Sequence, residues 1–148
     1  WLMLRSLKTL GVRVERQAES ALVIAEWLRT LPEVTEVYYA GLPDHPQYAL
    51  QKSQSTGFGA MISFKVKTAE IAQNVLAHLR LIAFAESLGG VESLLTYPIV
   101  QTHAEMPQDL IKRTGLDDRL LRLSVGLEDV EDLKEDLEQA LKKAAQEG

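Results

Sequence analysis

Two segments of this 148-residue sequence place charged or hydroxyl side chains where they could form a binding site. In residues 120–126, Arg122 interrupts an apolar run that predicts a strand. A guanidinium between two leucines must reach solvent or an anion, because burying it without a partner is costly. In residues 84–90, a predicted strand leads Glu86 and Ser87 to a glycine pair, whose missing side chains allow a ligand or another backbone to approach closely.

Each segment also has a simpler interpretation. Arg122 could face water on the open side of a sheet, or it could pair with an acid such as Asp118. Glu86 and Ser87 could be the first polar residues of a loop, and His103 is more typical of a loop residue than of a catalytic base. Composition and spacing alone therefore indicate two candidate sites without identifying a reaction.

The composition argues against several other kinds of site. The chain has no cysteine, and its three histidines lack the spacing of metal ligands, so we expect no metal site. The formal net charge of −5 has the wrong sign for a nucleic-acid binder. No leader and no long apolar segment is visible, so we expect a cytoplasmic protein without a membrane or nucleic-acid partner. Because the chain opens with Trp1 inside an apolar pattern, we expect it to be part of a longer protein.

The spacing of apolar residues predicts the elements that must position the two segments. One long amphipathic helix is expected over residues 7–28, and further helices over residues 48–54, 68–79, 108–113 and 130–144. Strands are expected over residues 34–39, 60–66, 81–85 and 120–125. This order predicts an α+β fold, with a mainly antiparallel four-stranded sheet covered by helices on one face.

Four stretches of the sequence resemble a known family when they are compared as strings. They include Leu7-Lys8-Thr9-Leu10, Gly57-Phe58-Gly59-Ala60, Glu86-Ser87-Leu88-Gly89-Gly90 and Arg122-Leu123-Ser124-Val125-Gly126. In content, order and separation they resemble the pyridoxal-phosphate (PLP) enzymes of cysteine and methionine metabolism. This family includes cystathionine γ-synthase, γ-lyase and β-lyase, methionine γ-lyase and the acylhomoserine sulfhydrylases. The resemblance covers nearly the whole chain.

The resemblance implies a place for this chain within a larger enzyme. Residues 1–148 correspond to the C-terminal substrate-recognition domain of a fold-type I PLP-dependent transferase, opening with the helix that links it to the cofactor domain. The family's cofactor lysine lies in a Ser-x-Thr-Lys motif, which this sequence lacks. We therefore expect pyridoxal 5′-phosphate to be bound by a missing N-terminal part, the chain by itself to be inactive, and the full-length protein to be a homotetramer.

The resemblance also implies roles for individual residues. Arg122 corresponds to the arginine that binds the α-carboxylate of the substrate, and Ser87 to a residue that helps to hold this carboxylate. Glu86 matches the glutamate of γ-synthases and γ-lyases, where it can attract a distal amino group, and Leu88 also agrees with the γ-type. Thr102 belongs to a Thr-His pair near the substrate entrance. No catalytic, cofactor-binding or metal-binding residue is expected in this chain.

The expected function is therefore that of a cystathionine γ-synthase or γ-lyase, with cystathionine or an acylhomoserine as the amino-acid substrate. Cystathionine β-lyase and acylhomoserine sulfhydrylase stay open as alternatives, because the sequence does not choose between elimination and replacement. A free-standing, non-catalytic α+β binding domain is the alternative from a different functional class.

Overall fold

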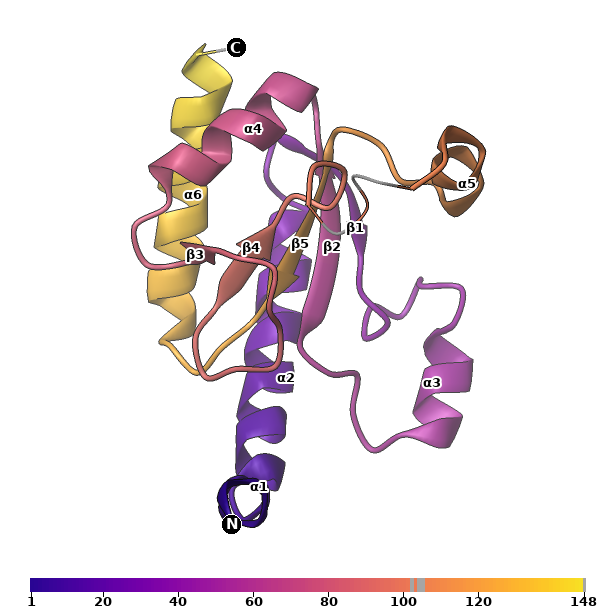
Figure 1. Cartoon of the computed structure of the whole chain (residues 1–148), viewed down its shortest axis with the longest axis vertical. Helices are drawn as coiled ribbons and strands as arrows, with labels where there is room; N and C mark the ends of the chain where they lie inside the picture. Colours follow the sequence, from indigo (N-terminus) through magenta and orange to yellow (C-terminus); the bar gives the residue numbers. More distant parts are fainter. Residues whose placement is uncertain (102, 104–105, 148) are drawn as a thin grey trace.

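The computed structural model describes residues 1–101, 103 and 106–147, and its strands form a single sheet (Figure 1). The strands are β1 (Val34–Tyr38), β2 (Met61–Val66), β3 (Ala83–Phe84), β4 (Leu94–Thr96) and β5 (Leu120–Ser124). The helices are α1 (Leu2–Leu7), α2 (Leu10–Leu28), α3 (Tyr48–Gln54), α4 (Ala69–His78), α5 (Gln108–Thr114) and α6 (Val130–Glu147). Within the described residues, the strand order is β1-β2-β5-β4-β3.

The sheet differs from the one that the sequence predicts. It has five strands rather than four, and it is mixed, because β3 runs parallel to β4 while the other neighbouring pairs are antiparallel. The sequence does not reveal β4 because its three residues are all buried and show no polar–apolar alternation. β3 is shorter than the predicted strand over residues 81–85, since the N–H groups of Leu81 and Ile82 bond to the carboxylate of Asp136 instead of a neighbouring strand.

Helices α2, α4 and α6 cover one face of the sheet, as Figure 1 shows, and α4 packs against α6. The core between the helices and the sheet is apolar. Its largest members with no or almost no exposure are Ile24, Leu28, Ile62, Phe64, Leu95, Leu121, Leu123, Leu133, Leu137 and Leu141. Helices α3 and α5 lie to the right of β1 in Figure 1, away from this layer. The opposite face of the sheet therefore remains available for a site.

The helix predicted over residues 7–28 is confirmed as α2 from Leu10 to Leu28, but it begins later than predicted, because the chain turns at Lys8 and Thr9 and separates α2 from α1. The carbonyl of Ser6 accepts hydrogen bonds from the N–H and hydroxyl of Thr9 and from Nη2 of Arg13. The apolar face is also buried only from Gln17 onward. Earlier apolar side chains are exposed, including Trp1, Leu2, Met3, Leu4, Leu7, Leu10, Val12 and Val14.

The remaining helices agree with the sequence pattern. Thr68 caps α4, and its hydroxyl oxygen accepts a hydrogen bond of 3.2 Å from the N–H of Ile71. The apolar stripe of α6 is buried from Leu133 to Ala144, while acidic side chains occupy its first turn, where the helix dipole favours negative charge. Among the residues that the structure describes, no helix is long and apolar enough to cross a membrane.

One buried carboxylate joins α6 to the beginning of β3. Asp136 accepts hydrogen bonds of 2.9 Å from the backbone N–H groups of Arg80, Leu81 and Ile82. Oδ1 of Asp136 also accepts a hydrogen bond of 3.1 Å from Nε2 of Gln139. A buried carboxylate that accepts several N–H groups is well compensated, whereas unpaired N–H groups at the same place would be costly.

We expect Asp136→Asn to lower the free energy of unfolding by about 2–3 kcal/mol, because the amide group brings N–H donors against backbone N–H donors and weakens the remaining bonds. Urea unfolding followed by circular dichroism measures this change. Asp132→Asn, an exposed acid on the same helix, is the control and should change the free energy by less than about 1 kcal/mol. Equal effects of the two substitutions would contradict this role of Asp136.

Candidate functional site

The candidate site lies on the face of the sheet opposite α2, α4 and α6. Side chains alternate between the two faces of a strand, so the burial of the leucines on both sides of Arg122 places Arg122 on the open face of β5. In the register of the sheet, Arg122 lies beside Ser63 of β2 and Thr96 of β4, and Ser63 lies beside Tyr38 of β1. A row of four polar side chains therefore crosses four strands.

Arg122 is held by the chain through one of its terminal nitrogens. Nη2 donates a hydrogen bond of 2.8 Å to the carbonyl oxygen of Glu86 and one of 3.2 Å to Oγ1 of Thr96. Nε is buried and has no hydrogen-bond partner among the described residues. The alternative pairing with the Asp118 carboxylate is not what the structure shows; the Asp118 carbonyl accepts the hydroxyl of Tyr97 at 2.7 Å. The buried Nε–H of the guanidinium is thus left for an anion from outside these residues.

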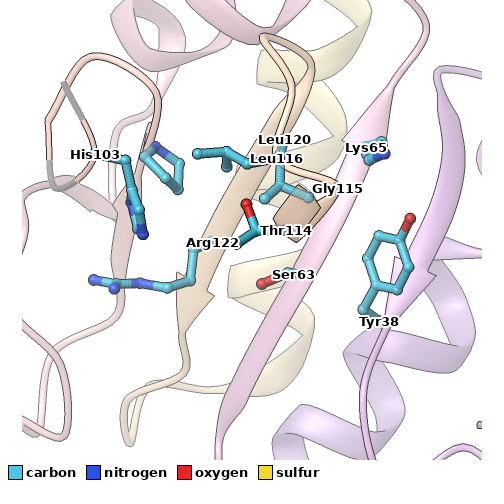
Figure 2. Close-up of a pocket in the computed structure, with 10 residues that line it drawn as sticks. Tyr38, Ser63, Lys65, His103, Thr114, Gly115, Leu116, Leu120 and Arg122 are labelled. Atoms are coloured by element: carbon cyan, nitrogen blue, oxygen red, sulfur yellow. The ribbon is translucent and has the colours of Figure 1, made fainter. Parts of the chain in front are cut away.

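A cavity of about 570 Å³ lies along this row. Figure 2 shows Arg122 and His103 at one end of it, Tyr38 and Lys65 at the other, and Ser63 between them. The turn that follows α5 forms part of the wall. His103 lies in a turn, as the loop interpretation predicts. Within residues 1–101, 103 and 106–147, no group of three or more potential metal ligands is found.

The loop between β3 and β4 reaches over the end of β5 and is tied down at two glycines. The N–H of Gly89 donates a hydrogen bond of 3.1 Å to Oγ of Ser124, and Nε2 of Gln17 donates one of 2.6 Å to the carbonyl of Gly90. Gly89 has a φ of +74°, in the left-handed region that favours glycine. The glycine pair noticed in the sequence therefore lets the loop pack on both β5 and α2.

A second set of hydrogen bonds fixes the end of the same loop. The carboxylate of Glu128 accepts the N–H of Ser93 at 2.7 Å and its hydroxyl at 2.8 Å, while Oγ of Ser93 accepts the N–H of Gly126 at 2.8 Å. A Cβ on Gly126 would overlap the carbonyl oxygen of Val91 and a carboxylate oxygen of Glu128. Glycine is therefore required where the chain leaves β5.

The other residues singled out in the sequence lie on or near this loop. Glu86, Ser87 and Leu88 follow β3 and have exposed side chains, and Leu88 is 56% exposed. The contact between Glu86 and Arg122 is a hydrogen bond to the backbone carbonyl of Glu86, not to its side chain. Thr102 lies outside the described residues. The structure thus brings Glu86 and Arg122 together and leaves the Ser87 and Leu88 side chains open to solvent.

Several residues of the site were not identified from the sequence. The alternation over residues 60–66 indicates that Ser63 and Lys65 share the face opposite the core, but only the register shows that Ser63 lies beside Arg122. Thr96 could not be assigned, because β4 was not predicted. The sequence places Tyr38 on a predicted strand of β-branched and aromatic residues, but this composition does not indicate on which face of the sheet its side chain lies.

Lys65, at the far end of the cavity, is largely buried and belongs to a charged cluster. Its Nζ lies 3.0 Å from Asp117 and 3.9 Å from Glu36, and Asp117 also pairs with Arg119 at 2.9 Å. Burial pulls the pKa of Lys65 down, but the hydrogen bond and charge of Asp117 outweigh it, so this pKa is raised. Burial likewise pushes the pKa of Asp117 up, but hydrogen bonds from Arg119 and Lys65 hold it below its usual range.

The lowered pKa of Asp117 predicts a stability that depends on pH. Its contribution is fully present above the unfolded-state pKa of about 3.9 and is lost as the pH falls through the lower folded-state pKa. We therefore expect Asp117→Asn to destabilise the protein at pH 7, and this difference from the wild type to shrink below about pH 3. Urea unfolding at both pH values measures the change. Asp118→Asn, at the exposed neighbour, is the control and should change the free energy of unfolding by less than about 1 kcal/mol at pH 7.

Comparison with known proteins shows the family. Residues 1–142 match the family described as Cys/Met metabolism PLP-dependent enzyme. A cystathionine beta-lyase of Bacillus subtilis is 48% identical over 145 residues, which are 98% of this chain and 37% of the relative. A cystathionine gamma-lyase of Bos taurus is 48% identical over 141 residues, covering 95% of this chain and 35% of the relative. The chain thus spans a little over a third of the length of these relatives.

Solved structures agree with this assignment. A cystathionine gamma-lyase from Lactobacillus plantarum, complexed with L-serine, superposes with a TM-score of 0.93 at 41% identity, over 98% of this chain and 38% of that one. A cystathionine gamma synthase from Xanthomonas oryzae pv. oryzae gives a TM-score of 0.93 at 44% identity, with the same coverage. The chain belongs to the Cys/Met metabolism family of PLP-dependent enzymes.

Proposed function

We propose that residues 1–148 form the C-terminal substrate-recognition domain of a PLP-dependent transsulfuration enzyme, in which Arg122 binds the α-carboxylate of an amino-acid substrate. The observation that carries this proposal is the buried Nε of Arg122, which has no hydrogen-bond partner among the described residues. A buried guanidinium N–H is costly to leave unpaired, so its position favours an anionic ligand. A carboxylate suits this group, because a guanidinium N–H donates a strong, charge-assisted hydrogen bond to a carboxylate oxygen.

The cofactor belongs to another part of the proposed enzyme. When bound, PLP supplies an electron sink for the bonds at the substrate's Cα. This chain contains no Ser-x-Thr-Lys motif, and the unpaired Nε of Arg122 fits one carboxylate rather than a pyridine ring with its phosphate. We therefore assign the cofactor to an N-terminal part and expect residues 1–148 alone to be inactive.

The contribution of this chain is to bind and orient the substrate. The sheet register and two chain acceptors hold Arg122 before a ligand arrives, so little side-chain entropy is lost on binding. Ser87, on the loop beside Arg122, is proposed to help hold the same carboxylate. Thr102 is proposed to lie near the substrate entrance. None of these residues is proposed to transfer a proton.

Glu86 is proposed to select the substrate at its distal end. Its carbonyl lies 2.8 Å from Nη2 of Arg122, so its exposed carboxylate is carried on the backbone that borders the carboxylate site. A carboxylate there would attract the second amino group of cystathionine. Together with Leu88, this favours a γ-synthase or γ-lyase activity; β-lyase and acylhomoserine sulfhydrylase are the alternatives within the family. A non-catalytic binding domain is the alternative outside it.

The exposed apolar side chains of α1 and early α2 support the proposal of a larger assembly. Trp1 is 84% exposed, and seven further apolar residues up to Val14 are exposed with it. A run of exposed apolar side chains of this kind is typical of a segment that packs against another part of a protein. We propose that the N-terminal part of the protein covers it and that the full-length enzyme is a cytoplasmic homotetramer.

The substitution Arg122→Lys tests the carboxylate assignment in the full-length enzyme. Lysine keeps the charge but places no N–H where Nε of Arg122 lies, so kcat/KM should fall for every amino-acid substrate, by about 2–4 kcal/mol. Steady-state kinetics with cystathionine and with an acylhomoserine plus cysteine measure the loss. Arg119→Lys is the control and should change kcat/KM little. Arg119 directly precedes β5 and pairs with Asp117. An unchanged kcat/KM in Arg122→Lys would refute the assignment.

The substitution Glu86→Ala tests the distal contact. The variant should lose about 1–3 kcal/mol in kcat/KM for cystathionine relative to methionine, because only cystathionine carries a distal amino group. The ratio of kcat/KM values for the two substrates in the wild type and the variant is the measurement. Glu26→Ala, an exposed acid on α2, should leave the ratio unchanged. Equal losses for both substrates would mean that Glu86 is only a residue of the loop.

A further inference from the structure

We propose that Thr96 is a positioning residue, which fixes the guanidinium of Arg122 in the orientation that receives the substrate carboxylate. This inference rests on the role proposed for Arg122. Thr96 lies on β4 directly beside Arg122 in the register and is only 1% exposed. Its Oγ1 lies 3.2 Å from Nη2 of Arg122. The sequence predicts no role for Thr96, because it does not predict the strand β4 on which Thr96 lies.

The direction of the hydrogen bonds at Thr96 is determined by its second partner. A hydroxyl has one proton to donate, and the Thr96 hydroxyl donates it to the carbonyl of Ala85 at 2.8 Å. Its oxygen can therefore only accept from Arg122, whose nitrogens can only donate. The chain Arg122–Thr96–Ala85 has a single possible polarity, so the hydroxyl cannot rotate to another arrangement without losing a bond.

The parallel pairing of β3 and β4 provides the acceptor for Thr96. Phe84 lies opposite Leu95, and the N–H of Ala85 donates a hydrogen bond of 3.2 Å to the Leu95 carbonyl. The backbone of Ala85 is thereby fixed beside Thr96, and the next carbonyl, that of Glu86, is the other acceptor of Arg122. Both acceptors of Nη2 thus depend on one short segment of parallel sheet.

These contacts engage Nη2 and leave Nε free. Nη2 carries two hydrogens, and its two acceptors are Thr96 and the Glu86 carbonyl. Two bonds from one nitrogen to acceptors on different residues define the plane of the guanidinium, while Nε keeps its unpaired hydrogen. Of the two acceptors, Thr96 is the buried one on a central strand pair, whereas Glu86 lies on an exposed loop. Thr96 is therefore the more rigid support.

The experiment compares three variants of the full-length, PLP-loaded enzyme. Thr96→Val keeps the shape of the side chain and removes the hydroxyl, and Thr96→Ser restores it. Thr35→Val is the matched control, because the Thr35 hydroxyl on β1 also donates to a backbone carbonyl, that of Lys65, at 3.2 Å. The measurements are kcat and KM for cystathionine, the calorimetric Kd of L-alanine as a simple α-amino carboxylate, and the melting temperature.

Thr96→Val should raise both KM and the Kd of L-alanine about tenfold, with kcat within about twofold of the wild type. A tenfold change corresponds to about 1.4 kcal/mol, the size expected for one hydrogen bond. Thr96→Ser should recover most of the affinity, and Thr35→Val should not change it. If Thr96→Val does not fold, Thr96→Ala takes its place under the same criteria.

Four results would overturn the proposal. An unchanged Kd in the hydroxyl-less variant, with a raised Kd in Arg122→Lys, would refute the role of Thr96 and leave that of Arg122 standing. A loss in Thr96→Ser as large as in Thr96→Val, or a fall of kcat together with melting temperature, would indicate a purely structural residue. An unchanged Kd in Arg122→Lys would instead refute the proposed function on which this inference rests.

Discussion

The alternation of side chains along β5 is the constraint on which the site depends. Leu121 and Leu123 are fully buried against the helices, and Arg122 between them must face the other way. A shift of one residue in the register would carry the guanidinium into the apolar core and both leucines onto the open face. Because β5 is paired antiparallel on both sides, its neighbours also resist such a shift. The hydrophobic core therefore determines where the cation lies.

The same strand also organises the surroundings of Arg122. Its last residue, Ser124, holds the N–H of Gly89, and the residues just beyond it hold Ser93 through Gly126 and the Glu128 carboxylate. These anchors fasten the middle of the glycine-containing loop, at Gly89, and its end, at Ser93. One short stretch of chain thus supplies the cation and most of the contacts that keep the bordering loop in place. The position of Arg122 and of the loop beside it is therefore fixed by side chains on and next to a regular strand, rather than by the loop itself.

The sequence predicts those parts of the fold and the site that depend on short local patterns, and it misses those that depend on contacts between distant segments. The strand of Arg122, the Thr68 cap and the stripe of α6 are local patterns, and the structure confirms them. The break between α1 and α2 was not predicted, because exposed apolar residues such as Leu7 continue the helical spacing without being buried. β4 is too short and too uniformly buried to show alternation, and with it Thr96 was missed. Contacts across strands depend on register, which no single segment encodes.

The hydrogen bonds that close the loop over β5 have a consequence for the order of folding. Gly89 and Ser93 are bonded to Ser124, Gly126 and Glu128, residues 33 to 35 positions later in the chain. During synthesis the loop emerges well before these partners exist, and long-range contacts form only after the entropy of loop closure has been overcome. The site is therefore completed late, when β5 has joined the sheet and the residues that follow it, up to Glu128, are in place. A chain that ends before this point has the sequence of the loop but not its geometry.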